Sequence, residues 1–364
     1  MPLAPTFDTS KLPPISDGLE GIVVAETVLS DVQGAAGRLT LRGKSVEELA
    51  ETGSFDSAVE HLTRDLLPAS APAQVSLAEG RSLAWEQIGV LRAADSDLSA
   101  FEMMTIGLAA LPSSAAGENS LMLAGALSVF LAGGYRLKAG LEPIAPDATA
   151  ETAADLLRML TGSVPPAAHV AGLNRYLTTV LDHGLNASTF AARVIASTNA
   201  GAKAGLLGAM GALSGPLHGG APGPVLDMLD AAQNSGNVRA WIGGELRAGR
   251  RLMGFGHRVY RTRDPRADVL KTGLAALSKD SGRVALAEEI EREALSALAL
   301  HKPERKLDTN VEFYTAVLLE AIGIDRSLFT PLFAVGRAPG WCAHMAEQQA
   351  KGRLIRPQSR YVGP

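Results

Sequence analysis

Residues 215–222 place His218 in a bend made almost entirely of glycine and proline, directly ahead of residues 225–229, which predict a helix. Glycine lets a backbone approach a ligand closely, and a helix start offers free N–H groups and a positive dipole end. An imidazole held there is pushed toward its neutral form, which donates a hydrogen bond to a carbonyl oxygen. A turn with an incidental histidine explains this stretch equally well, so the other polar residues of the chain must decide whether His218 has a structural or a chemical role.

Two further histidines and one acid have similar surroundings. His257 lies in the glycine-rich stretch 253–260, and His183 lies beside a glycine at an expected helix end. Glu312 stands in the first turn of a helix, where the dipole favours its ionised form. A carboxylate near neutral imidazoles is a general base with hydrogen-bond donors beside it. Each residue alone has a structural explanation, whereas the set favours catalysis.

Three arginines occupy positions that suit anion binding. Arg266 projects from a helix start, Arg337 lies in the tight stretch 335–340, and Arg356 lies in the tail. Planar guanidinium groups bind carboxylates with two parallel hydrogen bonds. Each arginine alone is typical of a solvated surface, but with a base and neutral histidines they suit a small di-acid as ligand.

Rival sites have weaker support. Zinc sites use three or four His, Cys, Asp or Glu ligands, commonly at short spacings, and no such short motif is present, so we expect no metal. The glycines around Phe255 lack the preceding strand and third glycine of a dinucleotide loop. Cys342 lies beside Trp341 in an apolar run, which indicates packing and not chemistry.

Length and composition set the broad class. A chain of 364 residues predicts roughly two domains, and a net charge of −4 argues against a nucleic-acid surface. A single cysteine excludes a disulfide framework within one chain and fits a reducing compartment. Residues 1–16 lack the apolar core of a secretory signal, and residues 121–135 are too short to span a membrane comfortably. We therefore expect a cytoplasmic protein with no membrane segment.

The elements that would position these residues are helical. A hairpin is expected from residues 22–24 and 38–41, and a short helix follows Ser45. Asp264 and Asn310 are predicted N-caps, the first followed by proline. Ile290 belongs to an amphipathic stripe. The predicted helices are 83–93, 98–110, 118–138, 149–161, 167–183, 187–213, 223–234, 236–250, 282–300, one from 310 to Gly323, and a last one from Thr330 to Gly352.

Several of these stretches resemble the signatures of the citrate synthase family, in the family's order. They are residues 182–190, 215–221, 254–266, 310–314 and 341–356. The resemblance is strong from about residue 137 to the end of the chain and looser before it. It implies an all-α, citrate-synthase-like homodimer with at most a small β-hairpin near the N-terminus. Residues 1–217 and 319–364 would form a large domain and residues 218–318 a small one, and the cleft would close on oxaloacetate.

The resemblance also implies roles, residue by residue. Glu312 would remove a proton from the methyl group of acetyl-CoA, His218 would donate to the thioester oxygen, and His257 would polarise the oxaloacetate ketone. Four residues of one subunit and one residue of its partner would bind oxaloacetate. The four are His183, His257, Arg266 and Arg337, and the partner subunit would supply Arg356. The expected CoA-binding residues are Arg251, Leu252, Met253, Gly254, Phe255, Gly256 and Lys306. No cofactor is expected, since the CoA thioester is a substrate.

One departure from the family pattern concerns the base. The family commonly has Asp at the position of Glu312, and the extra methylene moves the carboxylate by about 1 Å unless the backbone compensates, a displacement that can cost on the order of 10²-fold in rate. We expect compensation. A 2-methylcitrate synthase using propionyl-CoA differs by one methylene in a pocket. A non-catalytic helical dimer that binds CoA or a di-acid is the alternative from another class.

Overall fold

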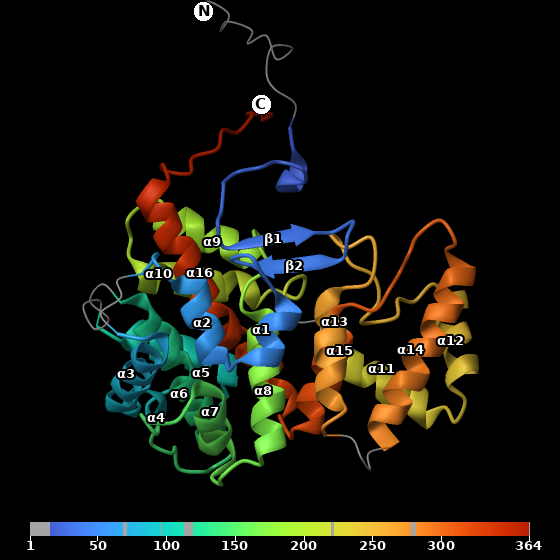
Figure 1. Ribbon diagram of the computed structural model, residues 1–364, viewed down its shortest axis with the longest axis horizontal. Helices are drawn as coiled ribbons and strands as arrows, with labels where there is room; N and C mark the ends of the chain where they lie inside the picture. The colour runs from blue at the N-terminus through green and yellow to red at the C-terminus, as the bar shows by residue number, and fades with distance from the viewer. Residues whose placement is uncertain are drawn as a thin grey trace, which may run out of the picture.

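The computed structural model describes residues 15–67, 71–95, 97–112, 119–219, 222–277 and 282–363. It is mostly helical, with one small three-stranded sheet, which confirms the predicted fold class (Figure 1). The N-terminal half holds a 3-10 turn (Asp17–Leu19), β1 (Ser30–Gln33), β2 (Arg38–Leu41), β3 (Lys44–Ser45), α1 (Val46–Thr52), α2 (Phe55–Thr63), α3 (Ala73–Glu86), α4 (Gly89–Arg92), α5 (Ala100–Ala110), α6 (Ser120–Lys138), α7 (Thr152–Thr161) and α8 (Ala167–Val180). The remainder holds α9 (Ala187–Ala196), α10 (Ala202–Leu213), α11 (Pro222–Asn234), α12 (Val238–Arg247), α13 (Pro265–Leu274), α14 (Gly282–His301), α15 (Val311–Ala321), a second 3-10 turn (Arg326–Leu328) and α16 (Phe329–Lys351).

The sheet differs from the expected hairpin. Strand β2 pairs antiparallel with β1, not with residues 22–24, and β3 adds a third short strand. In β2, Leu39 and Leu41 point into the core and are fully buried. The apolar residues 22–24 have no such face and remain exposed. Apolar composition alone therefore misplaced the partner strand.

Helix boundaries account for the other corrections. The expected helix 187–213 is two helices, α9 and α10, because Asn199 and Gly201 take positive φ values of 60° and 87° between them. The expected helix 167–183 ends at Val180, so His183 lies in a loop. Helix α3 begins ten residues before the expected start at 83, and α2 was not predicted. The expected last helix, from Thr330 to Gly352, is confirmed as α16, which runs without a break through the stretch around Arg337 and Pro339.

The predicted helix caps are confirmed. Asp264 accepts a hydrogen bond from the N–H of Arg266, with Pro265 at the first helical position. Asn310 accepts from the N–H of Glu312 in the same way. These caps fix the first turns of α13 and α15, and both turns carry a residue of the candidate site.

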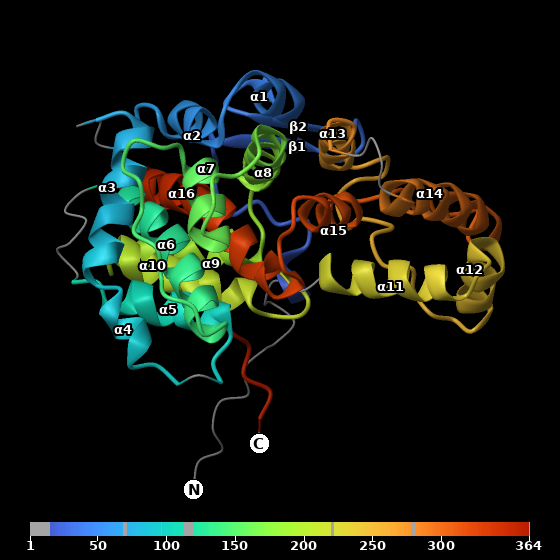
Figure 2. The same ribbon diagram turned by 90° about the horizontal axis from the view of Figure 1, so that it is seen from below.

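Two views of the ribbon agree on the arrangement of the helices. Helices α11, α12 and α14 lie at one end of the molecule, and α13 and α15 lie between them and the remaining helices (Figures 1 and 2). Helix α6 is long and apolar enough to cross a membrane, but 78% of its apolar window is buried inside the fold, as a core helix would be. The division into domains at residues 218–318 stays a prediction.

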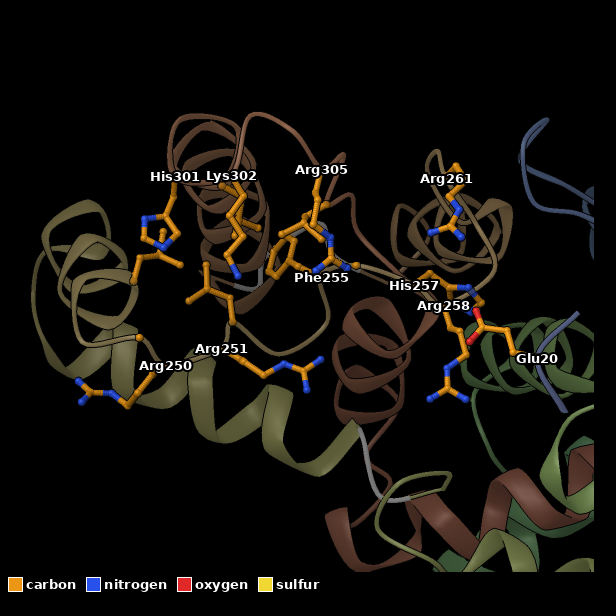
Figure 3. Close-up of a pocket in the computed structure, with 16 residues that line it drawn as sticks. Glu20, Arg250, Arg251, Phe255, His257, Arg258, Arg261, His301, Lys302 and Arg305 are labelled. Atoms are coloured by element: carbon orange, nitrogen blue, oxygen red, sulfur yellow. The ribbon is translucent and has the colours of Figure 1, made fainter. Parts of the chain in front are cut away.

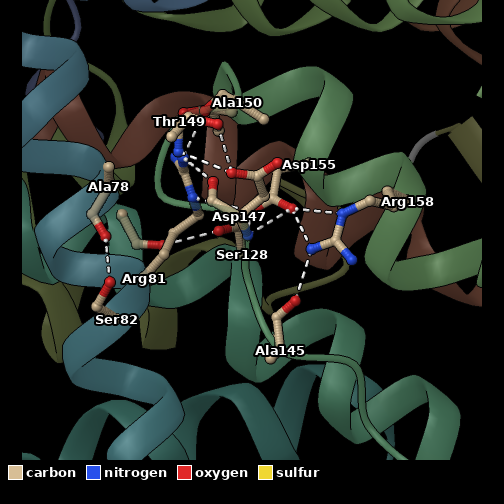
Figure 4. Close-up of polar contacts among 12 residues, drawn as sticks. Ala78, Arg81, Ser82, Ser128, Ala145, Asp147, Thr149, Ala150, Asp155 and Arg158 are labelled. Atoms are coloured by element: carbon tan, nitrogen blue, oxygen red, sulfur yellow. Dashed lines mark hydrogen bonds and ion pairs between the residues drawn. The ribbon is translucent and has the colours of Figure 1, made fainter. Parts of the chain in front are cut away.

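A buried polar network stabilises the packing of α3 on α7 (Figure 4). Arg81 and Asp155 are fully buried and form an ion pair of 3.0 Å. The Arg81 guanidinium also donates to Thr152 Oγ1 and to the carbonyl of Ala150. Because a buried charge is tolerated only when its hydrogen bonds are satisfied, removing either partner would destabilise this junction strongly.

Candidate active site

The loop before α13 is held by the segment before α15. The N–H of Gly256 donates to the carbonyl of Asp308 at 2.7 Å, and the Asn310 side chain donates to the carbonyl of Gly256 at 2.8 Å. Gly254 has a φ of 83°, and a Cβ there would lie 2.8 Å from Phe313. Glycine at this position is therefore required both by the backbone and by the close approach of α15.

The turn that follows His257, supported by the turn after β1, determines the orientation of the imidazole. Its Nδ1 accepts from the backbone N–H groups of Val259 and Tyr260, at 3.0 and 3.1 Å. A nitrogen that accepts carries no proton, so these two contacts favour the neutral tautomer protonated on Nε2, whereas the contact of Nε2 with Arg266 favours the other tautomer. The N–H of Arg261 donates to the carbonyl of Gly34, so the turn after β1 supports this loop.

Arg266 lies against the Nε2 side of His257. Its Nη2 is 3.3 Å from Nε2, while its Nε and Nη2 also donate to Asp264. In the tautomer protonated on Nε2, this nitrogen and Nη2 are two donors suited to a shared oxygen acceptor from a ligand. Burial, with the charge of Arg266 acting in the same direction, lowers the pKa of His257 to about 4. The group is therefore neutral at pH 7, as predicted.

His183 lies beside this pair. Its ring is 5.7 Å from the ring of His257, and its Nε2 is 3.1 Å from the hydroxyl of Tyr260. Burial, and then Arg266 and Arg337, hold the pKa of His183 well below its ordinary value. The loop that carries it is tied to β1, because the N–H of Gly184 donates to Ser30 Oγ.

Arg337 is almost fully buried on α16 and lies near several of the predicted groups. Its Nε donates to the carbonyl of Val180, the last residue of α8, and its guanidinium lies 4.7 Å from the ring centroid of Phe333. Burial lowers the pKa of Arg337 to about 10, although Asp182 opposes the shift. A guanidinium that is buried yet cationic at pH 7 is a strong anion-binding group.

His218 is held by the N-terminal turn of α9. Its Nε2 lies 2.8 Å from Ser188 Oγ, which also accepts from the indole N–H of Trp341 and lies 2.8 Å from Asn186 Oδ1. Burial, with a smaller contribution from Arg337, lowers the pKa of His218 to about 4. The predicted neutral form is correct in direction, but its main cause is burial.

The pKa of Glu312 differs from what the sequence predicted. We predicted that the helix start would favour the carboxylate, but burial raises the pKa of Glu312 to about 7, and the opposing charges of Arg266 and Arg337 do not cancel this effect. A base is most effective when its pKa lies near the working pH. Glu312, His183 and His257 thus share Arg266 as an electrostatic neighbour, and Glu312, His183 and His218 share Arg337.

A cavity of about 460 Å³ opens beside His257 (Figure 3). Its lining is basic, and Glu20 is the single acidic side chain among the described residues that line it. The basic side chains that line it are Arg250, Arg251, Arg258, Arg261, Lys302 and Arg305. Phe255 lies among them and offers an aromatic face. Such a lining suits a ligand with several phosphate groups.

The cavity contains only part of the predicted CoA-binding set. Arg251, Leu252, Phe255 and Gly256 line it, whereas Met253, Gly254 and Lys306 do not. Sequence reasoning missed Lys302 and Arg305, although the run of basic residues after α14 was a usable signal. It also missed Tyr260, Asp264 and Ser188, whose importance appears only in their contacts.

Arg356 is the predicted site residue that the single chain leaves apart. It is exposed, and it belongs to the tail after α16, which extends away from the helices in Figure 1. Its role across subunits stays a prediction. Among the described residues, no three His, Cys, Asp or Glu side chains form a group that could hold a metal ion. The prediction of a metal-free reaction also remains to be tested.

The fold and these groups define a class: a helical protein in which buried arginines and neutral histidines surround one carboxyl group beside a basic cavity. The family description "Citrate synthase, C-terminal domain" matches residues 18–358. The chain belongs to the citrate synthase family. Its predicted family membership is thereby confirmed.

Individual relatives agree with this assignment. "Putative citrate synthase 2" of Mycobacterium tuberculosis is 48% identical over 200 residues, so the match spans 55% of this chain and about half (53%) of that relative. "Citrate synthase 2" of Bacillus subtilis is 34% identical over 95% of both chains. The crystal structure of citrate synthase from Thermotoga maritima is 35% identical, with a TM-score of 0.85 and 96% of each chain covered.

Proposed function

We propose that this chain condenses acetyl-CoA with oxaloacetate and water to give citrate and CoA. What supports the proposal most is one observation: a carboxyl group with a pKa near 7 has two buried arginines as electrostatic neighbours, and each of two neutral imidazoles has one of these same arginines as a neighbour. A carbon acid as weak as a thioester needs a base of this kind and donors fixed in advance where negative charge develops.

In the proposed reaction, Glu312 takes a proton from the acetyl methyl group. His218 donates a hydrogen bond from Nδ1 to the thioester oxygen as it becomes an enolate. For Nδ1 to carry the proton, Nε2 must accept, so the Ser188 hydroxyl turns its proton from Asn186 to His218. The tautomer that His218 adopts therefore depends on Ser188.

The new bond joins the enolate carbon to the ketone carbon of oxaloacetate. The ketone oxygen accepts from Nε2 of His257 and Nη2 of Arg266, and it takes the Nε2 proton as the bond forms. The imidazolate left beside Arg266 then regains a proton, which balances the one that Glu312 took from the methyl group. His183, Arg266 and Arg337 bind the carboxylates, and Arg356 of a partner subunit adds a further cation. Water then hydrolyses the thioester and releases CoA as a thiol. The CoA phosphates fit the basic cavity, with Lys302 and Arg305 in place of the expected Lys306.

A similar protein supports this assignment of ligands. A citrate synthase from Thermoplasma acidophilum, 27% identical with a TM-score of 0.85, has been solved as a ternary complex with carboxymethyl coenzyme A and oxaloacetate.

The cytoplasmic location, the homodimer and closure of residues 218–318 over the substrates belong to the same proposal. Chelators should leave the rate unchanged.

Use of propionyl-CoA is the second candidate function. It is favoured by a Bacillus subtilis relative named "Citrate/2-methylcitrate synthase", which is 33% identical over 96% of both chains. The two activities differ by one methylene, worth roughly 1–3 kcal/mol in a pocket.

A substrate panel tests both candidates. Purified protein is assayed for thiol release with acetyl-CoA and propionyl-CoA, each paired with oxaloacetate and other 2-oxo acids, and the products are identified by mass. A higher kcat/KM for acetyl-CoA with oxaloacetate supports the proposal. A preference for propionyl-CoA would assign the second function, and no thiol release would favour a non-catalytic binder.

A further inference from the structure

Two contacts hold the tail that follows α16, up to the residue before Arg356. The side-chain amide of Gln348 donates to the carbonyl of Arg353 at 3.1 Å, and the N–H of Ile355 donates to Ser197 Oγ at 3.1 Å. Gly352 makes the first contact possible, since a Cβ there would lie 1.9 Å from the Gln348 amide nitrogen. The backbone that presents Arg356 is therefore fixed by α9 and α16.

Gln348 also joins a buried polar chain that leads back to the site. Its Oε1 accepts from Nε of Arg193 at 3.2 Å, and Nη1 of Arg193 lies 2.7 Å from Nδ1 of His344. Arginine only donates, so His344 accepts on Nδ1 and donates from Nε2 to Asp182 at 3.1 Å. Asp182 immediately precedes His183.

The buried groups of this series form a fixed support for Gln348. Arg193 is 3% exposed and is neutralised by Glu347 at 2.7 Å, and His344 and Asp182 are fully buried. Each member has a defined partner, so the series is a rigid support for Gln348. The loop that carries His183 and the tail are the two ends of one hydrogen-bonded series within a single subunit.

We propose that Gln348 is a positioning residue for Arg356: it anchors the tail of one subunit on the Arg193–His344–Asp182 series, so that Arg356 meets oxaloacetate in the partner's site. This inference rests on the proposed function and on the predicted role of Arg356. A tail held at Arg353 and Ile355 loses less conformational freedom when Arg356 binds, which strengthens oxaloacetate binding without touching the chemistry of Glu312.

The test compares Gln348→Met with Gln349→Met, which makes the same change one residue further on, at an exposed position. We expect Gln348→Met to weaken oxaloacetate binding about tenfold, with kcat and the KM for acetyl-CoA within about twofold of wild type. Gln349→Met should leave all three unchanged. Binding is measured by calorimetry as well as by KM, so the result does not depend on catalysis.

A double-mutant cycle identifies the route of the effect. Arg356→Ala alone should weaken oxaloacetate binding on the order of 30-fold, and adding Gln348→Met should then change it by less than about twofold, because both act through one contact. Equal losses from Gln348→Met in both backgrounds would overturn the proposal, as would unchanged binding in Arg356→Ala.

A second variant guards against misfolding. Ser197→Ala removes the other tail contact at the end of α9 and should weaken oxaloacetate binding about threefold with an unchanged Tm. If Gln348→Met or Ser197→Ala lowered the Tm and kcat together and raised both KM values, the changed contact would have a general structural role, and positioning would be refuted. Wild-type protein that binds oxaloacetate but forms no citrate would refute the proposed function alone.

Discussion

At the scale of single residues, the decisive property of Glu312 is the balance between burial and charge. Burial raises its pKa to about 7, while Arg266 and Arg337 oppose the rise. A proton acceptor must be deprotonated to act, so kcat/KM for acetyl-CoA should rise with pH through about 7 and level off above it. The histidines that act as neutral donors have pKa values of about 4 and do not limit this range.

Removing the carboxylate tests this assignment directly. Glu312→Gln keeps the size of the side chain but cannot accept a proton, so kcat should fall on the order of 10³-fold with little change in oxaloacetate affinity. Single-turnover citrate formation and calorimetry measure the two quantities. A near-normal kcat would mean that another residue is the base.

The same substitution should change stability in a pH-dependent way. The folded-state pKa of Glu312 is raised above the unfolded value, so its contribution is favourable at low pH and is lost as pH rises through about 7. Glu312→Gln should therefore raise the free energy of unfolding at pH 8.5 by on the order of 2 kcal/mol and change it little at pH 5. Thermal melts of both proteins at the two pH values measure the difference, and equal shifts at both would contradict the raised pKa.

At the scale of elements, capping chemistry was the most reliable guide in the sequence. Asp264 with Pro265, and Asn310, predicted the starts of α13 and α15 because an N-cap depends on one side chain and its next few residues. The partner of β2 and the break between α9 and α10 were missed, since both depend on what the rest of the fold buries. The shift in the pKa of Glu312 was missed for the same reason.

The loop between α12 and α13 offers a prediction at this scale. Gly254 has a positive φ and touches Phe313, so Gly254→Ala forces both the backbone and α15 to move. We expect a loss of stability of about 2 kcal/mol and a KM for acetyl-CoA raised several-fold, because Phe255 lines the basic cavity. Gly244→Ala is the matched control, since that helical glycine faces open space. A variant that kept both values would show that the loop adapts.

At the scale of the whole molecule, the recognised signatures predicted the family and the helical fold, and the single chain gathers every predicted oxaloacetate ligand except Arg356. Motifs record which residues belong to a site, but not which subunit supplies each one. Arg356 lies exposed on a tail whose backbone is anchored at Arg353 and Ile355. If the tail completes a neighbouring site, the active unit is a dimer, and each site combines Glu312 of one subunit with Arg356 of the other.

Hybrid dimers test this arrangement. A subunit with Glu312→Gln is co-expressed with one carrying Arg356→Ala, and the hybrid is purified through two different tags. If Arg356 acts across subunits, one site of the hybrid carries both defects and the other carries none, so activity should return to about half that of wild type, while each parent homodimer stays defective. If Arg356 served its own subunit, both hybrid sites would be defective and no recovery would occur. A hybrid no more active than the mean of its two parents would therefore disprove the exchange of tails.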